Sequence, residues 1–216
     1  MDGQCVLSRI CAFDCSSTHP EYSAGQFART YVNTRVDDNI YKNHVNDSSI
    51  THSSKDSPKS RYELYLESGN ILIPSINITK NECNRVPALY CEPNYMSNRE
   101  TNTFCISYSS IVNNTANGGY GCILLGKCDP LMRIDTCNII NNNQTDPNVA
   151  GTIATAANLF IKDSCILGNN NGNNVFCADP YYSCEIIISN CTIDDDIFSN
   201  TRYEGSVRVN KTIKRT

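Results

Sequence analysis

The feature that most constrains the fold is a repeated pattern of a small residue, an aliphatic residue two positions later, and a polar run. The stretches DTCNIINNN (135–143), DSCILGNNN (163–171) and SNCTIDDD (189–196) share this pattern. Other residues take the place of the cysteine upstream, so that the pattern extends through the chain. The anchors are Cys11, Ser48, Ile76, Ser109, Cys137, Cys165 and Cys191, with spacings of 26 to 37 residues. A repeat of this length indicates a solenoid.

Each unit also contains two further apolar segments of strand length. One follows the polar run, at 25–32, 61–68, 87–93, 119–126, 150–157 and 173–180, and the other precedes the anchor, at 70–75, 103–108, 131–135, 159–163 and 184–189. Alternating or continuous apolar runs of four to six residues predict strands. The alanines of 150–163 are compatible with a helix. We expect strand, corner and strand there, because Asn158 lies where a bend is due.

Short strands joined by asparagine-rich bends predict an all-β fold, a single-stranded parallel β-helix of about seven to eight coils. One coil cannot bury its own inner face, so successive coils must stack. Asparagine suits the corners because it tolerates the left-handed backbone region, and stacked asparagine side chains can hydrogen-bond between coils. We expect one domain over residues 1–216, with polar loop insertions near 33–60 and 92–102.

The anchor is the first inward position of its strand in this prediction. Residues two apart face the same side, so Cys137 and Ile139 point inward, and so do Cys165 and Leu167. We expect a ladder of small residues at the anchor, beside a tight corner. An alternative register aligns Ile139 with Ile166 and turns Cys165 outward.

Composition excludes several classes of function. A net charge of −4 without a long basic run argues against nucleic acid as a partner. The 13 cysteines contain no Cys-x-x-Cys pair, and His19, His44 and His52 lie apart from the cysteine groups, so a structural zinc site is not indicated. The odd count leaves at least one thiol unpaired. In a reducing compartment these cysteines act as small hydrophobic residues, and their disulfide state stays open.

The sequence shows no apolar stretch long enough to span a membrane, and MDGQCVLSRICAFDC lacks the pattern of a signal peptide. The chain as given is therefore expected in the cytoplasm. It is expected at the cell surface or outside the cell if it is a fragment of a longer protein, in which case exposed coil ends would self-associate. Six glycosylation sequons, beginning at Asn46, do not exceed chance in a chain with 28 asparagines.

Acidic residues are the candidates for catalysis or metal binding. Asp37–Asp38 and Asp194–Asp196 are adjacent carboxylates, and Asp135 and Asp163 fall one coil apart in the predicted register, where they could stack around a cation. Solvent-facing residues beside buried cysteines explain the same positions. No catalytic, cofactor-binding or metal-ligating residue is therefore assigned, and no cofactor is expected. The 12 tyrosines could stack on sugar rings, although tyrosine is also a favoured strand residue.

The units resemble a known family. Cys-x-Ile-x-Asn-Asn units alternating with NGGYGC (117–122) and AGTI (150–153) resemble polymorphic-membrane-protein-like right-handed β-helix proteins. They are closest to the Asn- and Cys-rich β-helix proteins of parasitic flagellate protists. Ile-x-x-Asn, as at Ile139–Asn142, stands where that family has Phe-x-x-Asn, and its Gly-Gly-Ala motif is never intact here. The resemblance implies a right-handed, pectin lyase-like β-helix and a role in surface display or adhesion.

Two functions from different classes follow. The first is a non-enzymatic structural or recognition protein that is adhesin-like and binds a glycan or a protein surface along one face. The alternative is a carbohydrate-active enzyme, either a polysaccharide lyase or a glycoside hydrolase, since β-helices also carry such activities and fold alone does not decide between them. The direction in which Asp135, Asp163 and Asp194–Asp196 point distinguishes the two.

Overall fold

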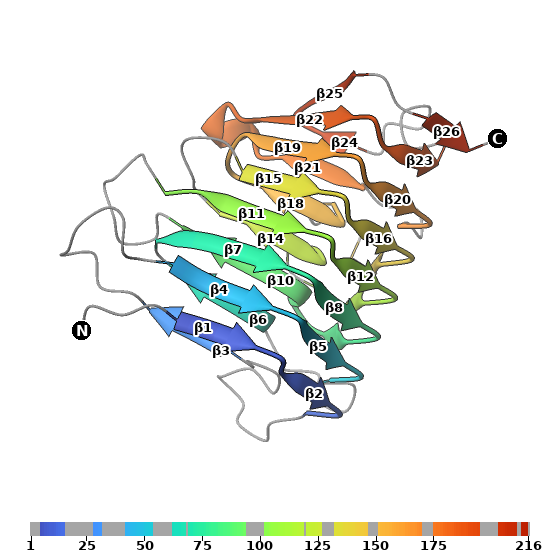
Figure 1. Ribbon diagram of the computed structural model, residues 1–216. Coiled ribbons are helices and arrows are strands. Elements are labelled where there is room, and N and C mark those ends of the chain that lie inside the picture. The colour runs from blue at the N-terminus through green and yellow to red at the C-terminus, as the bar shows by residue number, and fades with distance from the viewer. Residues whose placement is uncertain are drawn as a thin grey trace.

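The computed structural model describes residues 5–15, 28–31, 42–53, 62–67, 69–93, 102–118, 120–126, 132–146, 151–169, 175–194, 203–210 and 213–215. These residues form parallel strands stacked along one axis, from β1 near one end to β25 near the other (Figure 1). The one helical element among them is a short 3-10 helix, η1 (Pro180–Tyr182). The predicted all-β class is confirmed.

Two sheets of eight strands form two faces of the stack. Sheet A has the order β1 (Cys5–Ser8), β4 (Lys42–Asn46), β7 (Asn70–Pro74), β11 (Phe104–Ser107), β15 (Met132–Asp135), β19 (Leu159–Lys162), β22 (Glu185–Ser189) and β25 (Ser206–Asn210). Sheet B has the order β2 (Cys11–Phe13), β5 (Ser48–Thr51), β8 (Ile76–Thr79), β12 (Ser110–Val112), β16 (Asn138–Ile140), β20 (Cys165–Leu167), β23 (Thr192–Asp194) and β26 (Ile213–Arg215).

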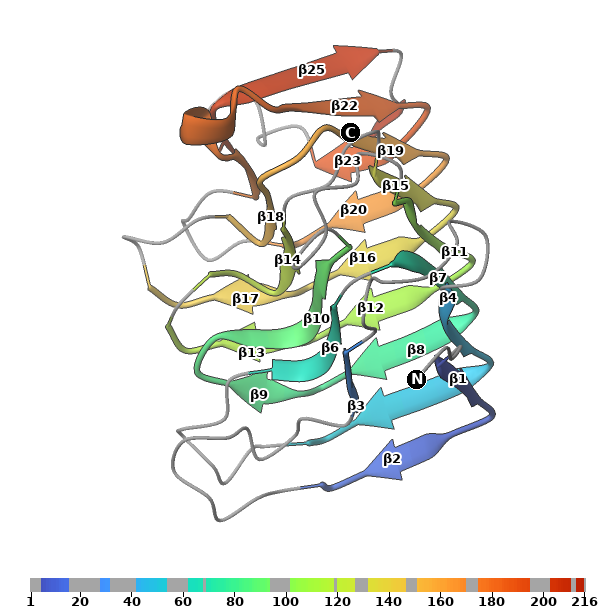
Figure 2. The same cartoon turned by 90° about the vertical axis from the view of Figure 1, so that its left-hand side faces the viewer.

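A third sheet and a small fourth one complete the described strands (Figure 2). Sheet C has the order β24 (Tyr203–Glu204), β21 (Phe176–Ala178), β18 (Ile153–Thr155), β14 (Ile123–Leu125), β10 (Val86–Glu92), β6 (Tyr62–Glu67) and β3 (Ala28–Tyr31). Sheet D has the order β17 (Asn143–Gln144), β13 (Thr115–Ala116) and β9 (Glu82–Cys83).

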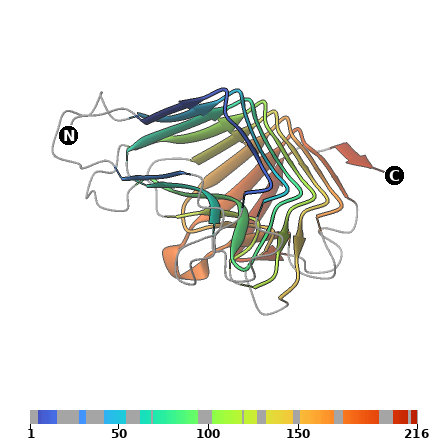
Figure 3. The ribbon, with the colours of Figure 1, turned by 90° about the horizontal axis from the view of Figure 1, so that it is seen from below.

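The chain runs through sheets A, B and C in turn, and we call one such passage a coil. Each strand pairs in parallel with the equivalent strand of the next coil, as Ile106 with Ile134 and Ile111 with Ile139. Seen along the stack, the coils superpose (Figure 3). This arrangement fits a parallel β-helix. The predicted strands match observed ones, and residues 153–162 form β18 and β19 with Asn158 between them.

The inward-facing residues of the three sheets form one core. In sheet B a ladder of isoleucines supplies this face, each at most 1% exposed: Ile50, Ile78, Ile111, Ile139, Ile166 and Ile193. Phe104 and Ile106 of sheet A and Leu89 and Ile123 of sheet C pack into the same core cluster. β-Branched side chains suit this pleated, densely packed interior.

The corner from sheet A to sheet B is made by a residue in the left-handed region. These residues are Arg9, Asp47, Ser75, Tyr108, Thr136, Asp163 and Asn190, with φ between 48° and 58°. The next residue is small in five of these coils, as the predicted ladder requires: Ser48, Ser109, Cys137, Ser164 and Cys191. In the other two coils it is Ile10 or Ile76, so the ladder of small residues is interrupted there. Ser109 and Ser164 donate to the carbonyl two residues earlier at 2.7 and 2.8 Å, and the thiol of Cys137 lies 3.2 Å from the equivalent oxygen. A side chain that donates across this tight corner is favoured there.

Two anchors of the predicted register are wrong by one residue. Cys165 pairs with Asn138, and Ile166 pairs with Ile139, so the inward corner position is Ser164. Cys165 is half-buried and faces outward, as in the alternative register. At the first coil Cys11 pairs with Ser49 and is exposed. At Cys165 both registers place an aliphatic residue inward, Ile166 or Leu167, whereas only the observed one places a hydroxyl, that of Ser164, at the corner. In the first coil the observed register buries Ala12 and leaves Phe13 exposed.

A second corner follows sheet B and carries a ladder of buried asparagines. The left-handed residues here are Asp14, His52, Lys80, Asn113, Asn141 and Gly168. The next residue turns inward, and Asn81, Asn114, Asn142 and Asn169 are each at most 1% exposed. Their amides bond one another from coil to coil. The expected asparagine ladder is therefore present, at the position after the corner rather than at the corner itself.

Part of the first expected insertion is regular structure. Residues 42–46 form β4 and residues 48–51 form β5. Residues 33–41, 54–60 and 94–101 of the two expected insertions lie outside the described residues.

Candidate functional site: a tyrosine-lined groove on sheet C

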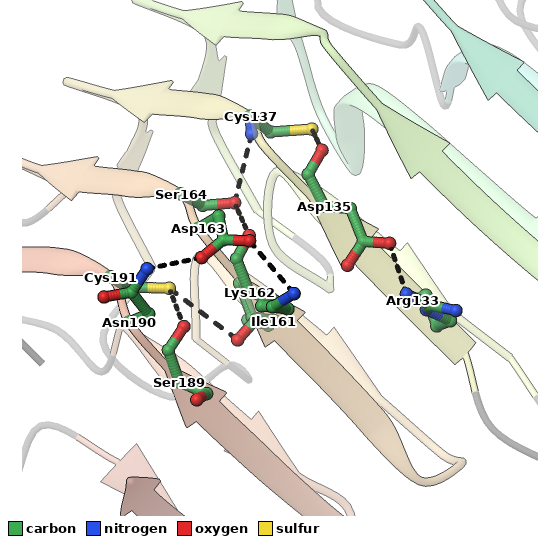
Figure 4. A network of polar contacts seen from close by, with 10 residues as sticks. All are labelled: Arg133, Asp135, Cys137, Ile161, Lys162, Asp163, Ser164, Ser189, Asn190 and Cys191. Atoms are coloured by element: carbon green, nitrogen blue, oxygen red, sulfur yellow. Dashed lines mark hydrogen bonds and ion pairs between the residues drawn. The ribbon is translucent and has the colours of Figure 1, made fainter. Parts of the chain in front are cut away.

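The acids singled out in the sequence do not converge. Asp135 pairs in register with Lys162, so Asp135 and Asp163 do not occupy the same slot, and the expected stack is wrong. Asp135 binds Arg133 at 2.7 Å. Asp163 accepts a hydrogen bond from Asn190 at 2.5 Å and pairs with Lys162 at 3.2 Å (Figure 4). The Asn190 amide, with the ammonium of Lys162, lowers the pKa of Asp163.

Asp194 accepts a hydrogen bond from the Gly168 amide at 2.6 Å, on the outside of sheet B. Asp37–Asp38 and Asp195–Asp196 lie outside the described residues, as does His19. His52 has a left-handed backbone conformation at the corner after sheet B, and its Nδ1 lies 2.8 Å from the Thr51 hydroxyl. The described residues contain no group of three His, Cys, Asp or Glu side chains able to hold a metal ion.

The site that the structure does form is a groove on the outer face of sheet C, with a volume of about 360 Å³. Its floor is made of Leu124, Gly126 and Ala156. Leu125 and Thr155 are paired in register and face the core, so Gly126 and Ala156 beside them face outward. Gly126 has no side chain and that of Ala156 is a methyl group, so the groove lies between the larger residues of the flanking coils.

One wall of the groove is a cluster of tyrosines. Tyr65 and Tyr90, which are paired across β6 and β10, stack with centroids 4.5 Å apart and planes 5° apart. Tyr62 packs against both rings at 5.1 Å. Tyr62 and Tyr90 line the groove, so the wall presents aromatic surface to a ligand.

Glu92 extends this wall over the floor. A Cβ atom added to Gly126 would lie 2.7 Å from Cγ of Glu92, so the glycine is what leaves room for the Glu92 side chain. The Tyr90 hydroxyl donates to Oε2 of Glu92 at 2.6 Å. Burial and this hydrogen bond raise the pKa of Tyr90, so its phenol keeps the proton that it shares with Glu92.

The opposite wall carries Asp179 and Tyr182. Asp179 caps η1, because its Oδ1 accepts from the Tyr181 amide at 2.9 Å. Tyr182, in η1, is 50% exposed and lines the groove. Cys91, Leu125, Thr155 and Ala178 are paired in register from coil to coil. The residues that follow them therefore occupy the same pleat position on four successive coils: Glu92, Gly126, Ala156 and Asp179.

Arg85 and Tyr120 close the groove at one side. The guanidinium carbon of Arg85 lies 5.6 Å from the centroid of the Tyr120 ring, within the range of a cation–π contact. Tyr120 is 47% exposed. The groove thus combines four tyrosine rings, two carboxylates and one guanidinium.

The groove is absent from the features predicted above. A signal for it exists in the repeated Tyr-x-Glu of YLE (65–67) and YCE (90–92), which recurs at equivalent positions of adjacent coils. An outward tyrosine and an outward acid two residues apart are not needed for the core. The alignment of Asp179 with Glu92 depends on connections of unequal length between strands.

Comparisons with protein-family models, with curated proteins and with solved structures found no match for this chain. Within the described residues, no helix has the length and apolar character needed to cross a membrane.

Proposed function

We propose that the chain is a non-enzymatic, adhesin-like recognition module, built on a right-handed parallel β-helix of seven to eight coils, that binds its ligand in the sheet C groove. The observation that carries this proposal is the groove itself, in which four tyrosines surround the floor of Leu124, Gly126 and Ala156: Tyr62, Tyr90, Tyr120 and Tyr182. Aromatic rings give a large contact area at a small cost in conformational entropy, and tyrosine is enriched in binding sites for this reason.

The positions of the acids also support a binding role. Asp135 and Asp163 bond with their own neighbours on the outside of the stack, remote from a shared groove. In the groove, Glu92 accepts from the Tyr90 hydroxyl and Asp179 caps η1. Each carboxylate therefore has a local structural partner. The resemblance of the repeats to surface-displayed β-helix proteins points in the same direction.

A second candidate is a glycoside hydrolase, because Glu92 and Asp179 face the same groove. Three steps of about 4.8 Å separate their backbones by about 14 Å, whereas paired carboxylates of glycosidases lie about 5–10 Å apart. The Glu92 side chain leans over Gly126 toward Asp179, which shortens the gap. Release of reducing ends from oligosaccharides, abolished by Glu92→Gln, would favour this candidate.

The test of the recognition proposal is a binding screen on immobilised glycans and peptides. The groove variant is Tyr120→Ala with Tyr182→Ala, since both side chains are about half exposed and their loss should leave the fold intact. The matched control is Tyr181→Ala, because Tyr181 is 92% exposed beside Tyr182 but does not line the groove. We expect ligands that bind the wild type and the control but not the groove variant. Equal binding by all three proteins, or no ligand at all, would overturn the proposal.

A further inference from the structure

The chemistry of the groove walls selects among ligand classes. Glu92 and Asp179 contribute two negative charges to the lining, and Arg85 contributes one positive charge. Among the described residues, neither carboxylate has an ion-pair partner: Glu92 is bonded by the Tyr90 hydroxyl and Asp179 by a backbone amide. The lining is therefore net negative, as is the whole chain at −4. An anionic ligand such as a polyuronate would be repelled.

The hydrogen-bonding groups point to a ligand that donates. The Tyr90 hydroxyl donates its hydrogen bond to Glu92. Both residues line the groove, and one oxygen of each carboxylate has its bond within the protein. The second oxygen of each carboxylate remains as an acceptor for a ligand. Carboxylates accept only, whereas ammonium and guanidinium groups donate only. A cation matches this set more closely than a neutral sugar, which needs donors and acceptors in balance.

The aromatic rings favour a planar cation. Arg85 already places its guanidinium over the Tyr120 ring, so the groove shows this contact within its own residues. A guanidinium stacks on an aromatic face and forms paired hydrogen bonds with a carboxylate, which an ammonium does not. The volume of about 360 Å³ accommodates a side chain but not a folded domain.

We propose that the groove binds an arginine side chain presented by an extended basic segment of a partner polypeptide. The inference rests on the proposed function and specifies its ligand. The guanidinium lies over Gly126 and Ala156, between Glu92 and Asp179, and the rings of Tyr90 and Tyr182 flank it. The flanking cationic residues of the segment add long-range attraction to the acidic chain.

The experiment measures binding of a capped, labelled peptide, Gly-Arg-Gly-Arg-Gly, by fluorescence anisotropy. A peptide with citrulline in place of arginine has nearly the same shape without the charge, and a lysine peptide keeps the charge without the planar group. We expect affinity for the arginine peptide to exceed that for the citrulline peptide by about tenfold or more, since hydrogen bonds between charged groups are the strong ones. The lysine peptide should be intermediate.

Protein variants locate the interaction. Glu92→Gln and Asp179→Asn keep the shape of the side chain. Each should lower the affinity for the arginine peptide by about tenfold. The control is Asp47→Asn, which removes one charge from an exposed corner between sheets A and B and should change affinity less than about twofold. The inference would be overturned if the citrulline peptide bound as tightly as the arginine peptide. It would also be overturned if Asp47→Asn lowered the affinity as much as the groove variants, because the attraction would then be nonspecific. Circular dichroism verifies that each variant is folded.

A neutral oligosaccharide, maltohexaose, separates failure of this inference from failure of the proposed function. If the groove variant loses binding of maltohexaose while the arginine peptide does not bind the wild type, recognition at the groove stands and the cationic ligand is wrong. If neither probe binds and the wider screen finds no ligand, both proposals fail.

Discussion

Nδ2 of Asn114 lies 2.9 Å from Oδ1 of Asn142, the equivalent residue of the next coil, in the interior of the stack. Asn142 in turn donates to Asn169 at 2.9 Å and to the carbonyl of Ile111 at 2.8 Å, and it accepts from the Asn114 amide at 3.1 Å. Each asparagine therefore bonds both adjacent coils. A buried polar ladder of this kind is stabilising only while all of its members are paired.

The Asn142→Ala variant should lose about 3 kcal/mol of unfolding free energy, because it leaves buried groups on Asn114, Ile111 and Asn169 without partners. Denaturant unfolding measures the change. The matched control is Asn138→Ala, an exposed outward position on β16, where we expect a loss within about 0.5 kcal/mol. Comparable losses at both positions would show that the ladder is not what stabilises this corner.

The ladder of small residues predicts how Cys137 tolerates change. Cys137→Ser should cost less than about 1 kcal/mol, since Ser109 and Ser164 occupy the same position in adjacent coils and donate to the same kind of carbonyl. Cys137→Leu should cost about 1–3 kcal/mol, because Cys137 is 2% exposed within the core cluster and a larger side chain must displace its neighbours. Thermal unfolding ranks the stabilities of the two variants. If Cys137→Leu were as stable as Cys137→Ser, the steric argument would be refuted.

Buried thiols predict a loss of stability at alkaline pH. Burial raises the pKa of Cys122 and of Cys137 to about 12, from an ordinary value of 9.0. Unfolded thiols therefore release their protons first, so the stability that these groups contribute is present below pH 9 and falls as the pH rises toward 12. Chemical unfolding between pH 8 and 11 measures this decline. The double variant Cys122→Ser, Cys137→Ser should decline less steeply, and an unchanged slope would contradict the assignment.

Gly121 is a position where both the backbone and the adjacent coil disfavour a side chain. Its φ is 109°, and an added Cβ would collide with the carbonyl oxygen of Gly151 in the next coil. Gly121→Ala should lose more than about 2 kcal/mol of unfolding free energy. Gly118→Ala is the control, because its nearest neighbour is the side chain of Asn84 and its φ is ordinary. Similar stability of the two variants would show that the coils can move apart at Gly121.

The strands were predictable from the sequence because each coil repeats the same apolar pattern, as at Ile111, Ile139 and Ile193. The register at Cys165 was not, since Ile166 and Leu167 are both apolar and either can fill the core. That one-residue error also produced the false stack of Asp135 on Asp163. The groove escaped prediction for another reason. Its walls come from coils three steps apart, and the side chains of Glu92 and Asp179 align only once every intervening connection is placed.

We propose the sheet C groove as the surface on which this molecule recognises a ligand. Hydrogen–deuterium exchange with and without saturating arginine peptide locates the binding surface, because it reports where on the chain the peptide slows exchange. We predict slower exchange in β10 and β14, around residues 86–92 and 123–126, with no change in β16 of sheet B at 138–140. Unchanged exchange in β10 and β14, or protection confined to sheet B, would contradict the claim.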